Sequence, residues 1–222
     1  MILKYISLYL NPDEYSVEQG MLFDFRARYL CNYLERKLKA LRFQTIGFNN
    51  ICIQGSHLSV DVCVIVPENA VASFVQFDWT RFQTLTRDEH HEFIIDMLSA
   101  GLRQVASQHL IPIEKLGNAI DDFRVGNYKN EWVHQTKLLR PVGLHASLLC
   151  RLTPEQFVLT LMLEIKGVTI YRKEILETKP DELIFAYRFK EVVLDGDSVV
   201  VKSKFGDPTF SIALSALPKA LD

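Results

Sequence analysis

Glycine, and the loops that depend on it, are scarce in this 222-residue sequence. Its ten glycines form neither a GxGxxG nor a GxxxxGK[ST] pattern, which excludes the common glycine-rich phosphate loops. The GxSxG pattern of serine hydrolases is also missing. No window approaches eighteen apolar residues, so we expect no membrane span. These absences leave no familiar nucleotide-binding, hydrolase or membrane signature.

An excess of charge of one sign is lacking as well. The 25 basic and 27 acidic residues give a formal net charge of −2, so we expect no nucleic-acid partner. The apolar N-terminal run is followed by Pro12 and two acids, without a small-residue cleavage site. We therefore expect no signal peptide.

Cysteine is sparse, and its spacing carries no motif. The four cysteines show no CxxC pair, and each lies in an apolar segment: Cys31, Cys52, Cys63 and Cys150. This arrangement predicts buried, reduced thiols and indicates a cytoplasmic protein. We expect no metal and no cofactor.

The first 130 residues alternate between helical and strand-like patterns. Ser16 and Gln19 have the spacing of a capping box, which predicts a helix start, and Pro112 divides two later helical stretches. One strand-like run alternates strictly and so places these residues on one face: Val60, Val62, Val64 and Val66. The expected elements are a strand over 2–10, a helix ending near Phe43, strands over 50–54, 58–66 and 73–85, and helices over 86–110 and 112–125.

From Trp132 onward the sequence consists of short β-rich runs separated by Pro, Gly, Asp and Thr. Asp195-Gly196 between two such runs predicts a hairpin turn. The stretch 181–194 is open between strand and helix, since Pro180-Asp181-Glu182 also suits a helix start. We expect a C-terminal meander of six or seven strands.

This order predicts an α+β fold with mainly antiparallel sheet, because helices and strands occur in runs without regular alternation. It contains one long N-terminal helix, a central helical pair and the C-terminal β-meander. Residues 1–130 make the α+β N-terminal part and 131–222 the meander. The short link GNYKNE at 126–131 predicts that the two parts pack as one unit.

The stretch TRDEHHEFIIDML at 86–98 is the densest group of ionisable residues. His90 and His91 lie among acids, but the HExxH zinc motif needs a histidine where Ile95 stands. Thr86 and Glu89 instead form a capping box, and the acids of a first helical turn suit the helix dipole. We interpret this stretch as a helix N-terminus.

Two partial motifs support an enzyme as the alternative. Gly55-Ser56 followed by Asp61 matches part of the nucleotidyltransferase pattern, but Cys63 stands in place of the second carboxylate. Glu164 and Lys166 form half of a restriction-type nuclease site and are expected on one strand face. A metal-dependent nuclease or transferase would assemble its site from dispersed residues: His57, Asp61, Glu131, His134, Glu164 and Lys166.

The segment 121–135 has the composition of a protein interface. Aromatic and basic side chains of this kind dominate binding hot spots, and the candidate partner-binding residues are Arg124, Tyr128, Lys129 and Trp132. We therefore expect a non-catalytic cytosolic module that binds another protein, of which bacterial immunity and antitoxin-type inhibitors are one class. A third hypothesis is a homodimer formed through an exposed sheet edge of the meander.

Overall fold

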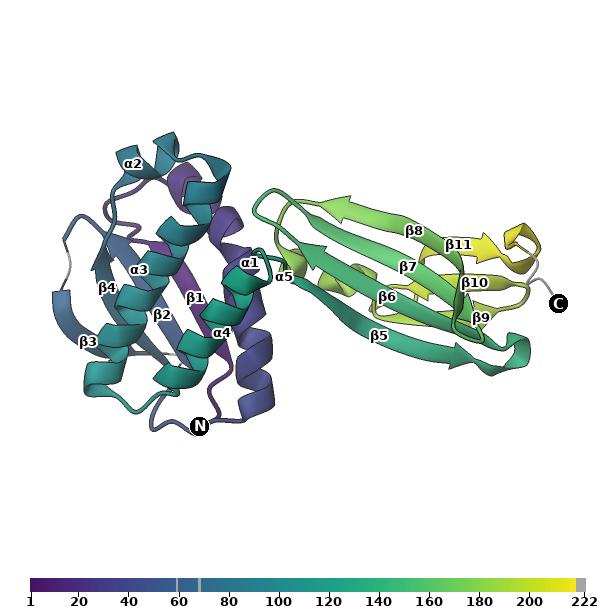
Figure 1. Cartoon of the computed structure of the whole chain (residues 1–222), viewed down its shortest axis with the longest axis horizontal. Coiled ribbons are helices and arrows are strands. Elements are labelled where there is room, and N and C mark those ends of the chain that lie inside the picture. The colour runs from purple at the N-terminus through teal and green to yellow at the C-terminus, as the bar shows by residue number, and fades with distance from the viewer. Residues whose placement is uncertain (59, 68, 219–222) are drawn as a thin grey trace. The chain divides into compact units, whose positions relative to one another are not determined.

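The computed structural model describes residues 1–58, 60–67 and 69–218 (Figure 1). Its contacts divide the chain into two compact units, Met1–Asn130 and Glu131–Asp222. Among the described strands, six of the eight pairings are antiparallel, so the predicted α+β class with mainly antiparallel sheet is confirmed.

The first unit is a four-stranded mixed sheet that packs against helices. The strands lie in the order β1-β2-β4-β3, with β1, β2 and β4 mutually parallel and β3 antiparallel at the edge. In Figure 1 the helices α3 and α4 lie in front of the strands. The elements are β1 (Tyr5–Leu10), α1 (Val17–Leu41), β2 (Asn50–Ser56), β3 (Val60–Val66), β4 (Ala70–Gln76), α2 (Trp79–Thr84), α3 (Arg87–Gln108) and α4 (Ile113–Val125).

The core of this unit lies between the sheet and the helices. Alternate residues of the strands form its floor, and helix α3 approaches that floor closely because residue 101 is a glycine. A Cβ at Gly101 would lie 2.5 Å from Cγ2 of Ile53, a distance that no real side chain tolerates. The buried floor residues are Ile6, Leu8, Leu10, Ile51, Ile53, Val71 and Val75.

Both predicted capping boxes are present. The backbone N–H of Ser16 donates to the Gln19 side chain at 2.8 Å, and the backbone N–H of Gln19 donates to Ser16 Oγ at 3.3 Å. At the start of α3, the Thr86 backbone N–H donates to Glu89 Oε2 at 2.8 Å. These bonds satisfy backbone donors that the first turn of a helix leaves open, and they fix where α1 and α3 begin.

The strand predicted over 73–85 is wrong in its second half. Strand β4 ends at Gln76, and residues Trp79–Thr84 form helix α2. Asp78 caps this helix by accepting from the Arg81 backbone N–H at 3.0 Å, and Phe82 is buried against Phe77. The cap and the aromatic packing outweigh the β-preference of this aromatic-rich stretch.

The second unit consists of two antiparallel sheets. One has the order β5-β6-β7-β8 and the other β11-β10-β9. Its core holds alternate residues of β6 and β7 together with Phe189 and the valines of β10. The elements are β5 (Glu131–Leu139), β6 (Leu144–Leu152), β7 (Phe157–Ile165), β8 (Val168–Thr178), α5 (Glu182–Phe185), β9 (Glu191–Asp195), β10 (Ser198–Lys202) and β11 (Pro208–Ala213), with short 3₁₀ turns at Arg140–Val142, Ala186–Arg188 and Leu214–Ala216.

The stretch 181–194, which the sequence left undecided between helix and strand, contains both. One expectation about Lys166 is wrong. Asp181 caps the short helix α5, and the chain then enters β9. The Asp195-Gly196 hairpin is confirmed, since β9 and β10 pair across it and Gly196 has φ +56°. Lys166 does not share a strand face with Glu164, because it lies in the β7–β8 turn at φ +49°.

Candidate functional site

On the side of the first sheet opposite the core, the residues that the strand pairing aligns are all uncharged. Cross-strand pairing aligns twelve residues in three rows, and we call them the uncharged sheet face. Paired residues project to the same side of a sheet, so each row is a set of neighbouring side chains. The rows are Tyr5–Asn50–Ala70–Val66, Ser7–Cys52–Ala72–Val64 and Tyr9–Gln54–Phe74–Val60.

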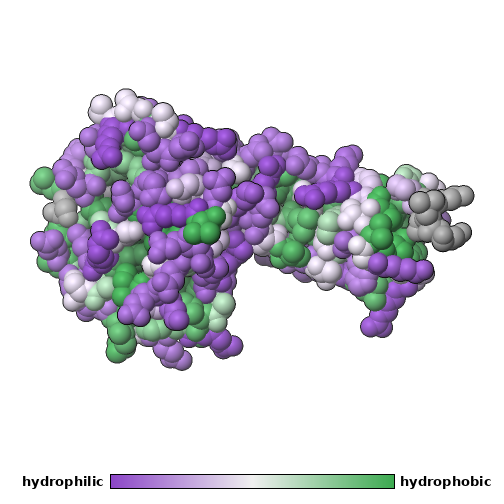
Figure 2. Space-filling view, in the orientation of Figure 1, coloured by the Kyte–Doolittle hydropathy of each residue, from purple (hydrophilic) through white to green (hydrophobic). Residues whose placement is uncertain are grey.

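Much of this face is open to solvent although its larger residues are apolar or aromatic. The exposed fractions are 45% for Tyr5, 43% for Tyr9, 48% for Val60 and 46% for Val64. In Figure 2, which views the unit from the helices, hydrophilic residues predominate over α3 and α4. The helical side therefore has the polar surface of an ordinary globular protein, and the uncharged sheet face does not.

Two groups on the face have raised pKa values. Burial raises the pKa of the Cys52 thiol to about 11, so this cysteine is a neutral thiol at physiological pH. Burial also raises the pKa of Tyr9 above its ordinary value. Ser7 Oγ donates to Asn50 Oδ1 at 3.1 Å, which joins β1 to β2 on this side. The face therefore stays uncharged across the physiological pH range.

The edge strand β3 is distorted where it borders the face. Its pairing with β4 shifts between Val60 and Val64, which leaves an irregular stretch. The Gln108 side chain of α3 bonds to this stretch, accepting from the Cys63 backbone N–H at 3.1 Å and donating to the Asp61 carbonyl at 2.9 Å. The Gln108 amide thus forms hydrogen bonds with two backbone groups that the bulge prevents from bonding to β4.

Two of the predicted partner-binding residues converge on a single carboxylate. Arg124 donates through Nε and Nη2 to Glu92 at 2.9–3.1 Å, and the Tyr128 hydroxyl donates to Glu92 Oε1 at 2.7 Å. The Arg124 bonds hold the pKa of Glu92 below its ordinary value. The ring of Tyr128 stacks on His91 with centroids 4.3 Å apart. This cluster links α3 to the end of α4.

The two histidines of 86–98 are buried in the helical packing. His90 accepts from Arg26 Nη1 at its Nε2 (2.7 Å), and His91 Nδ1 lies 2.6 Å from the Tyr29 hydroxyl. They contact different partners on α1. The expected helix N-terminus is therefore confirmed, with the imidazoles directed inward.

The other two predicted partner-binding residues lie elsewhere. Lys129 is exposed, and the neighbouring Asn130 is buried, with its side chain donating to the Tyr29 carbonyl at 2.7 Å. Trp132 belongs to the second unit, where its ring lies 6.2 Å from that of Phe157. The four residues therefore divide between the two units, two of them around Glu92.

The dispersed residues of the enzyme alternative also divide. His57 and Asp61 belong to the first unit, and the other four belong to the second. Within the second unit, Glu131 lies opposite Arg151 in the strand register, and Glu164 lies opposite His145. Arg151 and His145 are at opposite ends of β6, so the two glutamates are about 20 Å apart. Within residues 1–58, 60–67 and 69–218, no three His, Cys, Asp or Glu side chains are grouped to hold a metal ion.

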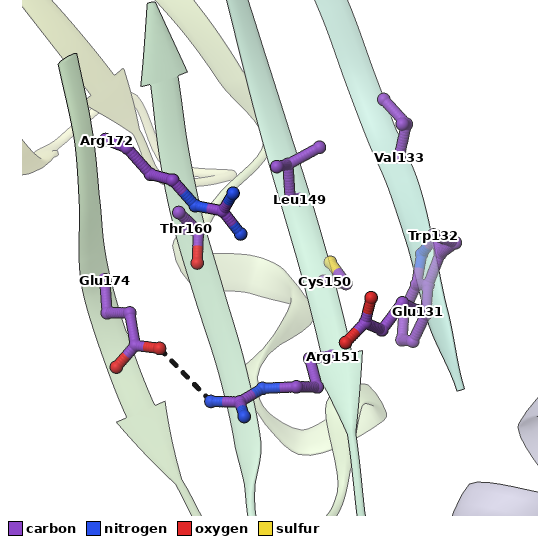
Figure 3. Close-up of a pocket in the computed structure, with 9 residues that line it drawn as sticks. All are labelled: Glu131, Trp132, Val133, Leu149, Cys150, Arg151, Thr160, Arg172 and Glu174. Atoms are coloured by element: carbon purple, nitrogen blue, oxygen red, sulfur yellow. Dashed lines mark hydrogen bonds and ion pairs between the residues drawn. The ribbon is translucent and has the colours of Figure 1, made fainter. Parts of the chain in front are cut away.

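A pocket of about 410 Å³ lies on the β5–β8 sheet (Figure 3). The ion pair of Arg151 with Glu174, 3.1 Å long, joins β6 to β8 across the intervening β7. Two arginines face two glutamates in this pocket, so its charge selects neither an anion nor a cation. The lining residues are Glu131, Trp132, Val133, Leu149, Cys150, Arg151, Thr160, Arg172 and Glu174.

Comparisons with known proteins add no relative. No protein-family model, no curated protein and no solved structure matches the chain. Of the helices in the described part of the chain, none is both long and apolar enough to cross a membrane.

Proposed function

We propose that this chain is a non-catalytic protein-binding module whose binding surface is the uncharged sheet face. The observation that carries the proposal is the composition of that surface. Twelve side chains from four strands include no charge, although charged residues make up 23% of the chain and about three would be expected among twelve. Interface centres differ from the remaining protein surface in this same way, by depletion of charge and enrichment of aromatic residues.

A surface that only meets water gains nothing from remaining uncharged. Lysine or glutamate at an exposed strand position discourages association, and natural sheets use such residues for that purpose. Val60 and Val64 are nearly half exposed, and they lie on the strand at the sheet edge. Keeping valine there favours contact with a partner.

In its finer form the proposal is a cytosolic inhibitor of the immunity or antitoxin type, which holds a partner protein inactive by stoichiometric binding. Such a protein needs a rigid scaffold and one complementary surface. The sheet supplies both, because its other side is anchored to the helices by a buried core.

The test compares three forms of the full chain as bait in an extract of its native cells. The double variant Val60→Lys with Val64→Lys places two charges on the face, and Val125→Lys is the matched control on α4, where the valine is 89% exposed. We expect one stoichiometric partner on the wild type and on Val125→Lys, and at least tenfold less on the double variant. Equal recovery on all three baits would contradict the proposal, provided that their circular dichroism spectra agree.

A further inference from the structure

We infer that the pocket on the β5–β8 sheet binds a short peptide with both termini free, about three residues long, between Arg172 and Glu131. This site lies in the second unit, and the inference is independent of the function proposed for the uncharged sheet face. Three features carry it: two unpaired charges of opposite sign, a hollow between two β-bulges, and the distance between the charges.

The first feature is the pair of charges that the pocket leaves without partners. Of its four charged residues, Arg151 and Glu174 neutralise each other at 3.1 Å. Among the described residues, neither the Arg172 nor the Glu131 side chain takes part in a hydrogen bond or an ion pair. Exposed charges without partners are common, but these two differ in sign and border one hollow. In Figure 3, Arg172 extends from β8 across β7 and Glu131 extends from β5 toward β6, so they point toward each other.

The second feature is the shape of the sheet beneath these charges. The pairing of β5 with β6 skips His134, and that of β7 with β8 skips Ile175, so a β-bulge lies on each side of the pocket. Bulges bend a strand, re-aim its side chains and are frequent beside functional sites. The volume of about 410 Å³ is typical of small-ligand pockets. The Thr160 hydroxyl, which has no hydrogen-bond partner among the described residues, lines the pocket one strand away from Arg172.

The third feature is the distance between the unpaired charges. Strands β5 and β8 are separated by two strands, or about 14 Å at about 4.8 Å per spacing. In the strand register Arg172 is level with Ser147, and Glu131 is level with Arg151, about 13 Å further along β6. The two Cα atoms are therefore about 19 Å apart. Since the side chains extend toward each other, a gap on the order of 10 Å remains between their charged groups.

The size of this gap defines the ligand. The Arg172 guanidinium can donate two parallel hydrogen bonds to a carboxylate, and the Glu131 carboxylate can accept from an ammonium group. A ligand that engages both carries one charge of each sign about 10 Å apart. An extended peptide spans about 3.3–3.6 Å per residue, so about three residues place its termini at that distance. A pocket whose charge selects neither an anion nor a cation is thus suited to a zwitterion.

Titration of the isotope-labelled full chain with tri-alanine, followed by amide chemical shifts, tests this inference. From the usual affinity per atom of small ligands, we expect a Kd on the order of 0.3 mM. Acetylating the amine or amidating the carboxylate of the peptide should weaken binding about tenfold or more. Arg172→Gln should weaken the binding of tri-alanine by a similar factor but should leave that of tri-alanine amide unchanged. Glu131→Gln should show the same pattern with the acetylated peptide.

The matched control is Glu177→Gln, at an exposed position of β8 outside the pocket, which should bind tri-alanine as the wild type does. The inference is overturned if the wild type fails to bind tri-alanine well above the expected Kd, or if the free and capped peptides bind equally. Equal losses in Arg172→Gln and Glu177→Gln also overturn it. The capped peptides test the wild type itself, so the result does not depend on the folding of any variant. None of these outcomes bears on the bait experiment for the uncharged sheet face.

Discussion

At the scale of single residues, Glu92 links the third helix to the fourth. Its carboxylate accepts from Arg124 through two nitrogens and from the Tyr128 hydroxyl, while Arg124 also contacts Asp121 at 3.0 Å. Tyr128 adopts φ +56°, a conformation rare for an aromatic residue. Its hydroxyl bond and its stacking on His91 hold it there. Arg124 and Tyr128, selected from the sequence as binding residues, thus also have a structural role.

The first prediction is that Glu92→Gln lowers stability more at neutral pH than in acid. The pKa of Glu92 is lower in the folded chain than its ordinary value of 4.5, mainly because Arg124 donates to the carboxylate. The stabilisation is therefore complete above pH 4.5 and is lost as the pH falls through the lowered pKa. Because the carboxylate is 41% exposed, we expect only about 1 kcal/mol at pH 7.

Thermal unfolding of the two proteins at pH 7 and pH 3 checks this prediction. The expected difference in Tm is about 2–4 °C at pH 7 and smaller at pH 3. Asp96→Asn, at an exposed position of the same helix, serves as the control and should show no such pH dependence. A Glu92→Gln difference that is the same at both pH values would rule out the carboxylate as its source.

At the scale of elements, the distance between α3 and the sheet depends on a single glycine. Alanine at residue 101 would place its Cβ within 3 Å of three carbons of Ile53, two of them attached directly to that residue's Cβ. We predict that Gly101→Ala destabilises the chain by about 1–3 kcal/mol, because the helix must move away from β2.

Gly117→Ala in α4 is the matched control. A Cβ at this position meets nothing within 4 Å, so only the helix propensity changes. We expect a gain of about 0.5–1 kcal/mol, since glycine inside a helix is less favourable than alanine. Urea denaturation measures both variants, and two changes of the same sign would contradict the close approach of α3.

Elements with strong local signals were predictable from the sequence, and those decided by tertiary contacts were not. The capping boxes of Ser16 and Thr86 gave the starts of α1 and α3, since their bonds lie within four residues. Residues 77–85 were mispredicted because the same aromatic side chains suit a strand or a helix. The burial of Phe82 and the cap from Asp78 decide between them.

The same limit applies to the uncharged sheet face. Period-two spacing placed Val60, Val62, Val64 and Val66 on one face. The strand pairing aligns Val60, Val64 and Val66 on that face, whereas Val62 lies in the irregular stretch and has no pairing partner. Spacing cannot show whether a face lies toward the core or toward solvent. That depends on the pairing of β3 with β4 and on which side α3 lies. The even spacing of Tyr5 and Tyr9 was the one sequence signal for this face. It identifies a shared face only after the four strands have been aligned.

At the scale of the whole molecule, each of the two units has its own buried core. Leu30 on α1 and Leu161 on β7 are both completely buried, and each lies in a different unit. Truncating either to alanine removes a comparable volume, so each change should cost about 2–5 kcal/mol. The unit in which protection from exchange is lost then shows whether the two units unfold separately.

We predict that hydrogen exchange rises only within the unit that carries the substitution. Leu161→Ala should speed amide exchange in β6 and β7 while leaving α3 protected, and Leu30→Ala should do the reverse, because each unit has a buried core of its own. If either variant speeds exchange in both units, the chain unfolds as one cooperative body, as the shortness of the 126–131 link predicts. In that case the uncharged sheet face would depend for its stability on residues of the C-terminal meander, and a binding partner would protect amides throughout the chain.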